Sequence, residues 1–139
     1  MLLLDTHIWI WNVEGDARRL GRRARQWIVR AKSHGAVRVS PISLFEITSL
    51  HTAGRLRLSR PPEQWIRDSL ETPGVLIAEL STAVAIDAGR IPREALPDPV
   101  DRCLVATTRQ LDATLMTSDA RILDYAAKTG NVRVHDGRR

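Results

Sequence analysis

The sequence opens with Met1-Leu2-Leu3-Leu4-Asp5-Thr6-His7, in which an apolar run leads directly into an acidic residue. A short apolar run without a polar face is typical of a strand covered on both sides, as in a parallel sheet. The carboxyl ends of such strands border the ligand crevice of open α/β sheets. The sequence therefore predicts a buried first strand that carries Asp5 to a crevice at its end.

Further apolar runs along the chain alternate with segments of helical spacing. The predicted strands are residues 37–39, 75–78, 114–117 and 132–134, and the predicted helices are residues 6–13, 17–32, 42–53, 63–70, 82–88, 99–111 and 120–128. We expect Asp16 to cap the helix over 17–32, because aspartate is a favoured N-cap residue. Strands that alternate with helices predict one α/β domain with a mainly parallel sheet.

Length and composition limit the number of domains and the class of protein that we expect. The 139 residues, 43% of them hydrophobic, suffice for one domain, which we expect over 1–135 with a polar tail over 136–139. No apolar run reaches the roughly 18 residues of a membrane span, and the opening run meets an acid too early for a signal peptide. The single cysteine, Cys103, cannot form an internal disulfide, so we expect a reducing, cytoplasmic setting.

The chain is basic, with 21 Lys and Arg against 16 Asp and Glu and a formal net charge of +5. Lys32 and Lys128 are the only lysines, so nearly all of the positive charge is on arginine, which suits phosphate recognition. A GC-rich genome also favours arginine, and the arginines over 17–32 fit either a solvated helix face or a phosphate-tracking surface. The net charge favours an anionic partner.

Acidic residues recur where predicted strands end. Asp5 follows the first strand, Glu46 lies just after the second, and Asp119 ends the fourth. Asp101, with Asp98 beside it, begins the helix that precedes the fourth strand. If the first and fourth strands are neighbours in a parallel sheet, these acids meet at one edge of it.

Carboxylates gathered in this way repel one another and need a cation, because burying them unpaired is costly. Arg102 is the arginine nearest to them in sequence, and no metal-ligating Cys or His set accompanies them. An all-oxygen set suits Mg²⁺ or Mn²⁺ rather than zinc. We therefore predict a metal site on a basic protein, which points to phosphodiester hydrolysis of a nucleic acid. The predicted metal ligands are Asp5, Glu46, Asp98, Asp101 and Asp119.

Structural roles for single acids, and two other functions, stay open at this point. Asp98 and Asp119 could serve only as helix N-caps, and Asp101 only as a partner of the helix dipole. The domain could be a non-catalytic module that binds a metal or a partner. A phosphatase with an aspartyl nucleophile would also begin with a strand ending in Asp, but it would normally have a second acid where this chain has His7.

Four segments together resemble a known family. Leu3–His7, Ser43–Ile47, Asp98–Ala106 and Met116–Asp119 resemble the four acidic motifs of PIN-domain ribonucleases, in particular of the VapC-like toxin branch. The motifs follow the family's order and cover nearly the whole chain. The resemblance implies a Rossmann-like, three-layer α/β/α sandwich around a mainly parallel sheet of about five strands.

The resemblance also implies an activity and a set of site residues. The activity is Mg²⁺- or Mn²⁺-dependent endoribonuclease action on RNA, commonly a tRNA or an rRNA. The family's four catalytic acids fall on Asp5, Glu46, Asp101 and Asp119. The expected substrate contacts are Thr6, Thr117, Ser118 and Arg102. The expected partners are a VapB-like antitoxin, whose C-terminal segment fills the crevice, and a second copy of the chain in a homodimer.

Overall fold

The computed structural model describes residues 1–139 and contains one five-stranded sheet in the order β3-β2-β1-β4-β5. The strands are β1 (Leu2–Leu4), β2 (Val37–Val39), β3 (Val75–Ile77), β4 (Thr114–Thr117) and β5 (Val134–Asp136). Every neighbouring pair is parallel, and β1 lies between β2 and β4. The predicted parallel sheet and the predicted pairing of the first and fourth strands are confirmed.

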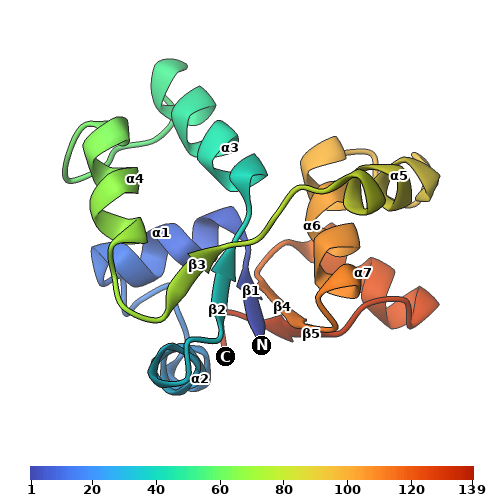
Figure 1. Cartoon of the computed structure of the whole chain (residues 1–139), viewed down its shortest axis with the longest axis horizontal. Coiled ribbons are helices and arrows are strands. Elements are labelled where there is room, and N and C mark those ends of the chain that lie inside the picture. Colours follow the sequence, from blue (N-terminus) through green and yellow to red (C-terminus); the bar gives the residue numbers. More distant parts are fainter.

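Helices cover both faces of this sheet and make it the middle of three layers (Figure 1). They are α1 (Thr6–Glu14), α2 (Arg22–Ser33), α3 (Pro41–Thr52), α4 (Pro62–Leu70), α5 (Thr82–Arg90), α6 (Pro99–Gln110) and α7 (Ala120–Thr129). Alternate residues of β1 serve the two faces, because successive strand side chains point in opposite directions. Leu2 and Leu4 pack in the core beneath α1–α4, and Leu3 packs in the core beneath α6 and α7. The predicted three-layer α/β/α sandwich is confirmed.

Helix α2 begins later than predicted. The Asp16 carboxylate does not cap it but accepts the backbone N–H groups of Arg18 and Arg19 in a turn, and α2 starts at Arg22. Gly21 is the N-cap residue, and a Cβ at this position would collide with the backbone of Arg139. The helix is therefore shortened by a tertiary contact with a distant segment.

The end of the chain packs against that helix start. Strand β5 covers Val134–Asp136 rather than 132–134, because Val134 pairs in register with Leu115. In the predicted polar tail, the carbonyl of Gly137 accepts the N–H of Gly21 and that of Arg139 accepts the N–H of Ala24.

None of the helices in this structure combines the length and the apolar character that a membrane span requires.

Candidate active site

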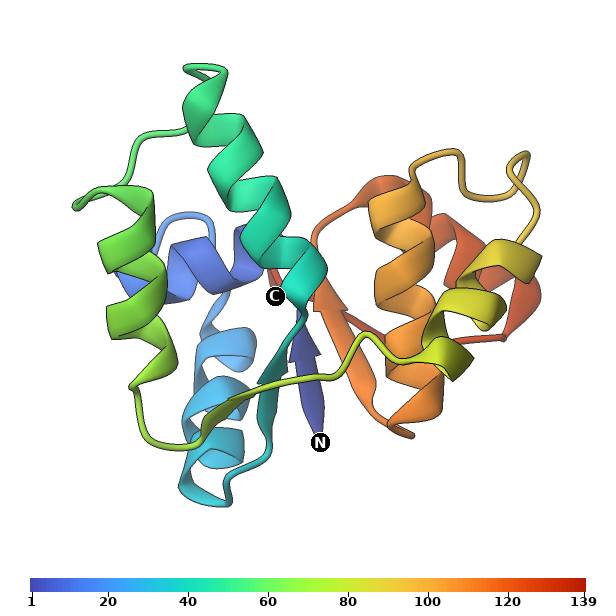
Figure 2. The same ribbon diagram turned by 45° about the horizontal axis from the view of Figure 1, so that its top comes forward.

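The predicted acids meet around one cavity at the carboxyl ends of β1 and β4. In Figure 2 these strand ends point into the space between α3 and α6. The cavity has a volume of about 310 Å³. Its lining residues are Asp5, His7, Trp11, Glu46, Asp98, Asp101, Ser118 and Asp119. The structure thus brings together residues that are up to 114 positions apart in the sequence.

Asp5 is the most firmly held of these acids. It is the N-cap of α1, and its Oδ1 accepts the backbone N–H of Thr6 at 2.7 Å. Its Oδ2 accepts the hydroxyl of Thr117 at 2.6 Å, so the carboxylate is bridged from β1 to the end of β4. Because the side chain is only 8% exposed, this geometry fixes one carboxylate at the floor of the cavity.

The hydroxyls of Thr6 and Thr117 face the protein rather than the cavity. Both residues are fully buried, and Thr6 donates to the hydroxyl of Ser43 at 2.9 Å. Thr117 holds Asp5 and also accepts the backbone N–H of Asp119 at 3.0 Å. Both threonines, which we expected to contact substrate, thus support the site from behind the cavity in this structure.

Helix α6 supplies two acids from its first turn. Asp98 is its N-cap and accepts the N–H of Val100 at 2.9 Å, and Pro99 follows at the first helical position, where it loses no hydrogen bond. Asp101 is 7% exposed and lines the cavity without a hydrogen-bond donor from another side chain. The capping role of Asp98 is thus seen, whereas nothing in the helix itself requires an acid at Asp101.

Helices α7 and α3 supply the remaining acids. Asp119 is the N-cap of α7 and accepts the N–H groups of Arg121 and Ile122 at 2.8 and 3.2 Å. Glu46 reaches the cavity from the second turn of α3. The acids therefore stand near the N-terminal ends of four helices, where the helix dipole is positive and offsets part of their repulsion.

Of the other two predicted substrate contacts, only Ser118 lines the cavity. Ser118 follows β4 directly and lines the cavity. Arg102 is half-buried on α6, next to Asp101 in sequence, but it is not among the residues lining the cavity. The lining therefore contains five carboxylic acids and neither lysine nor arginine.

Burial, together with this uncompensated charge, raises the pKa of the two buried acids. The pKa of Asp5 rises to about 6, chiefly through burial, against the opposing hydrogen bonds from Thr117 and Thr6. The pKa of Asp101 rises to about 8, first through burial and then through repulsion by Asp119, Asp98, Asp5 and Glu46. Both shifts favour the neutral acid, so a bound cation would strongly change the charge state of the site.

The donor set fits a hard divalent ion held partly through water. No three His, Cys, Asp or Glu side chains of the structure are close enough to enclose a metal ion directly. Mg²⁺ usually keeps several waters and binds proteins through only one or two carboxylates, so direct enclosure by three side chains is not required. The site offers carboxylate oxygens, has no basic side chain in its lining to balance their charge, and has a volume of about 310 Å³. These three features agree with such an ion.

Two lining residues lie outside the predicted site. His7 and Trp11 are on α1, with ring centroids 6.3 Å apart and ring planes tilted by 57°. Their spacing of four residues places them on the same face of α1, the helix that Asp5 caps. This spacing is the signal in the sequence that could have identified them as neighbours of the acid.

Comparison with known proteins agrees with this arrangement. Among curated proteins, none matches the chain. The fold is similar to that of VapBC from Salmonella typhimurium in its DNA-bound structure (TM-score 0.67, 18% identity, 97% of this chain and 96% of that one). It is also similar to VapBC2 from Rickettsia felis bound to a promoter DNA fragment (TM-score 0.64, 13% identity, 96% of this chain and 96% of that one). A third similar structure is FitAcB from Neisseria gonorrhoeae (TM-score 0.60, 21% identity, 99% of this chain and 98% of that one). These identities establish a shared fold. The PIN domain family model matches residues 2–128, so the chain belongs to the PIN domain family.

Proposed function

We propose that this protein is a metal-dependent endoribonuclease and the toxin of a VapBC-type toxin–antitoxin pair. The observation that carries the nuclease proposal is the convergence of five carboxylic acids on one cavity without a lysine or arginine in its lining. Such a cluster in a protein with a net charge of +5 suits a metal ion at the centre and an anionic polymer around it. Membership of the PIN domain family supports nuclease activity.

In this proposal Asp5 and Asp101 hold Mg²⁺ or Mn²⁺ directly, and Glu46, Asp98 and Asp119 act through water or at a second ion. The ion supplies Lewis-acid stabilisation of the charge that develops on the phosphate. The Thr6 N–H and the Thr117 hydroxyl keep the Asp5 carboxylate in one orientation. A carboxylate fixed in advance loses little freedom when the substrate arrives, which favours the reaction.

The reaction is the attack of water on the phosphorus, in line with the 3′ oxygen that leaves. Glu46 or Asp119 orients the attacking water and accepts its proton, because both carboxylates line the cavity from sides other than that of Asp5. As its bond to phosphorus breaks, the 3′ oxygen takes a proton from solvent water, and Glu46 or Asp119 returns the proton that it accepted to solvent. The products carry a 5′ phosphate and a 3′ hydroxyl. Ser118 and the neighbouring Arg102 contact the substrate.

The toxin part of the proposal rests on the shared fold. The similar structures are of VapBC and FitAB-type proteins, including one described as a toxin–antitoxin complex from Klebsiella pneumoniae. By this likeness the partner is a VapB-like antitoxin, the protein is a homodimer, and the substrate is a cytoplasmic RNA such as a tRNA or an rRNA. The acidic cavity would accept a basic side chain from the antitoxin for the same reason that it accepts a cation.

Incubation of purified, partner-free protein with total RNA tests the nuclease proposal. The expected result is discrete cleavage with Mg²⁺ or Mn²⁺, none with EDTA, and none by Asp5→Asn, which keeps the shape of the side chain but not its charge. Asp112→Asn is the matched control, because Asp112 is an exposed acid outside the cavity. Equal cleavage by Asp5→Asn and the parent protein would overturn the assignment, and intact RNA with every folded protein would favour a non-catalytic binding module.

A further inference from the structure

We propose that a groove beside α1 binds the single-stranded RNA segment that flanks the cleaved phosphate, with Arg55 and Arg57 contacting its backbone and Trp11 and His7 its bases. This inference rests on the proposed ribonuclease function and names the path of the substrate. The groove has a volume of about 560 Å³ and is lined by α1, the turn after it and the segment between α3 and α4. That size lies in the usual range of ligand-binding clefts, roughly 300–1,000 Å³.

The groove is continuous with the acidic cavity. His7 and Trp11 line both of them, so a ligand leaving the acids along α1 meets this aromatic pair and then the groove. In Figure 2, α1 lies beside α3 and α4, and the segment that connects these two helices runs along the outer edge of the molecule. A polymer is the kind of substrate that would use both hollows at once.

The segment Arg55–Leu58 alternates basic and apolar residues and belongs to neither a helix nor a strand. Leu56 and Leu58 pack against the core beneath α1–α4, whereas Arg55 and Arg57 are exposed. Exposure thus alternates along the segment, and both arginines are among the residues that line the groove. The apolar anchors therefore fix two arginines on the groove side.

These two arginines are free to bind an anion. Neither Arg55 nor Arg57 has an acidic partner within ion-pair distance. The acids in the groove are engaged locally, since Glu14 accepts the N–H of Ser59 at 2.9 Å and the indole N–H of Trp65 at 3.1 Å. Asp16 accepts two backbone N–H groups of its own turn and faces the guanidinium of Arg19 at 3.6 Å.

The aromatic pair favours RNA over an acidic peptide. Trp11 is half-buried and His7 is exposed, so each offers part of a ring surface at the junction of groove and cavity. Every base has a face that stacks on such rings, and stacking combined with cationic side chains is the common mode of binding single strands. The acidic cavity cannot attract a phosphate backbone by itself, so the arginines of the groove would supply the attraction.

The test compares two double variants that lose the same charge. Arg55→Gln with Arg57→Gln removes the groove arginines, and Arg22→Gln with Arg25→Gln removes two exposed, unpaired arginines of α2 as a matched control. Cleavage of total RNA is measured for both, and the affinity for a mixed-sequence single-stranded oligoribonucleotide is measured by fluorescence anisotropy in the Asp5→Asn background. His7→Ala and Trp11→Phe probe the aromatic pair.

We expect the groove variant to weaken binding about tenfold or more and to lower the salt slope of log K by about 1.4, since each lost phosphate contact accounts for about 0.7 on single strands. The apparent KM should rise with kcat unchanged, because these contacts bind substrate and transition state alike. His7→Ala should weaken binding about fivefold or more, and Trp11→Phe should keep most of the affinity. The α2 variant should match the parent.

Three other results overturn the proposal and are distinguishable. If the parent cleaves RNA and the groove variant binds it with the parent's affinity and salt slope, the groove is off the substrate's path and a protein segment becomes the better occupant. If the folded parent neither binds nor cleaves RNA, the proposed function fails and the groove proposal fails with it. Equal losses in the groove and α2 variants would mean that net charge, not the groove, attracts the RNA.

Discussion

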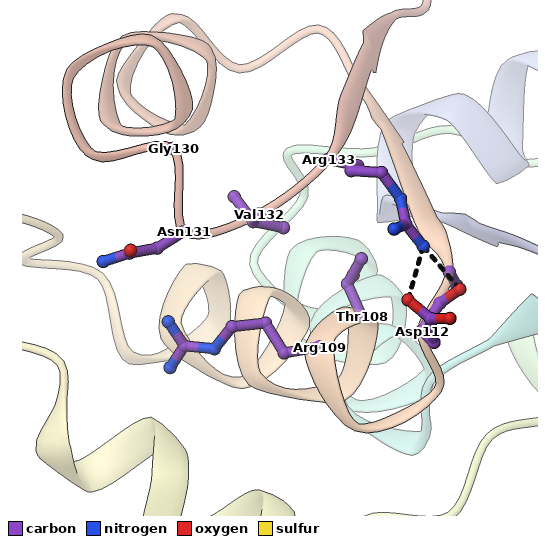
Figure 3. Close-up of a pocket in the computed structure, with 8 residues that line it drawn as sticks. Thr108, Arg109, Asp112, Gly130, Asn131, Val132 and Arg133 are labelled. Atoms are coloured by element: carbon purple, nitrogen blue, oxygen red, sulfur yellow. Dashed lines mark hydrogen bonds and ion pairs between the residues drawn. The ribbon is translucent and has the colours of Figure 1, made fainter.

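Two cavities at opposite ends of β4 differ in whether their charged side chains are paired. The acidic cavity at its carboxyl end has five carboxylic acids and no basic residue in its lining. The cavity at its amino end has a volume of about 230 Å³ and includes Arg109, Asp112 and Arg133 (Figure 3). There Arg133 donates to the Asp112 carboxylate at 2.8 Å, and Arg109 donates to both carboxylate oxygens of Asp87 at 2.8 and 3.1 Å.

This difference in pairing distinguishes charges that stabilise the fold from charges that are left unpaired for a ligand. At the amino end each arginine is neutralised by a neighbouring acid, so the cavity needs nothing further. At the carboxyl end, burial together with repulsion by the neighbouring acids raises the pKa of Asp101 to about 8, which is a cost to the folded protein. A protein keeps such a cost where function requires it, and this contrast gives the order of the following expected effects.

The largest effect is expected for Asp101→Asn. Cleavage of RNA should fall at least about 100-fold, because the variant loses a carboxylate proposed to bind the metal and leaves a neutral amide in its place. Asp112→Asn at the amino end should leave the rate unchanged, and asparagine tolerates the positive φ of 50° at that position. The measurement is the initial cleavage rate at saturating Mg²⁺, and similar losses for both variants would remove the contrast between the two cavities.

The second effect is on stability as a function of pH in the absence of metal. Asp5 and Asp101 have raised pKa values of about 6 and about 8 in the folded protein, so the folded state binds more protons than the unfolded state between about pH 4 and pH 8. The free energy of unfolding should therefore fall as the pH rises through this window. One pKa unit corresponds to about 1.4 kcal/mol, and we expect a fall of at least that size.

Urea unfolding at several pH values measures this dependence. Asp101→Asn should abolish most of the fall between pH 6 and pH 8, and Mg²⁺ should reduce it in the parent because the ion binds the charged acids. A parent protein whose stability is flat or rises across this range would show that the acids are not mutually destabilising. The unpaired charge of the carboxyl end would then have no energetic consequence.

A smaller effect on RNA cleavage is expected from removing the hydrogen bond that Thr117 donates to Asp5. Thr117→Val keeps the shape of the side chain but removes the 2.6 Å hydrogen bond to Asp5, so cleavage should fall about tenfold, the equivalent of one ordinary hydrogen bond. Thr117→Ser keeps the hydroxyl and should retain most of the activity. Equal rates for the valine and serine variants would mean that burial alone fixes the Asp5 carboxylate.

The sequence was most informative where a residue's role depends on its own strand. The apolar run before Asp5, the parallel sheet and the gathering of acids at strand ends all follow from local patterns and one rule of α/β topology. The start of α2 could not be predicted in this way, because Gly21 is constrained by Arg139, more than 100 residues away. The same holds for Thr117, whose use as a support for Asp5 depends on how β1 and β4 pair.

The smallest effect is expected at the amino end, from Arg133→Gln. Arg133 and Asp112 are exposed, and solvent-exposed ion pairs contribute at most about 1 kcal/mol, so the free energy of unfolding should change by less than that. Added salt should shrink even this change, whereas the pH dependence caused by the buried acids at the carboxyl end should persist, because buried charges are screened much less. Urea unfolding at low and high salt measures both the stability change in Arg133→Gln and the pH dependence of the parent. A large, salt-resistant loss in Arg133→Gln would show that the paired charges of the amino end hold the fold together, and that pairing alone does not distinguish a structural cavity from a functional one.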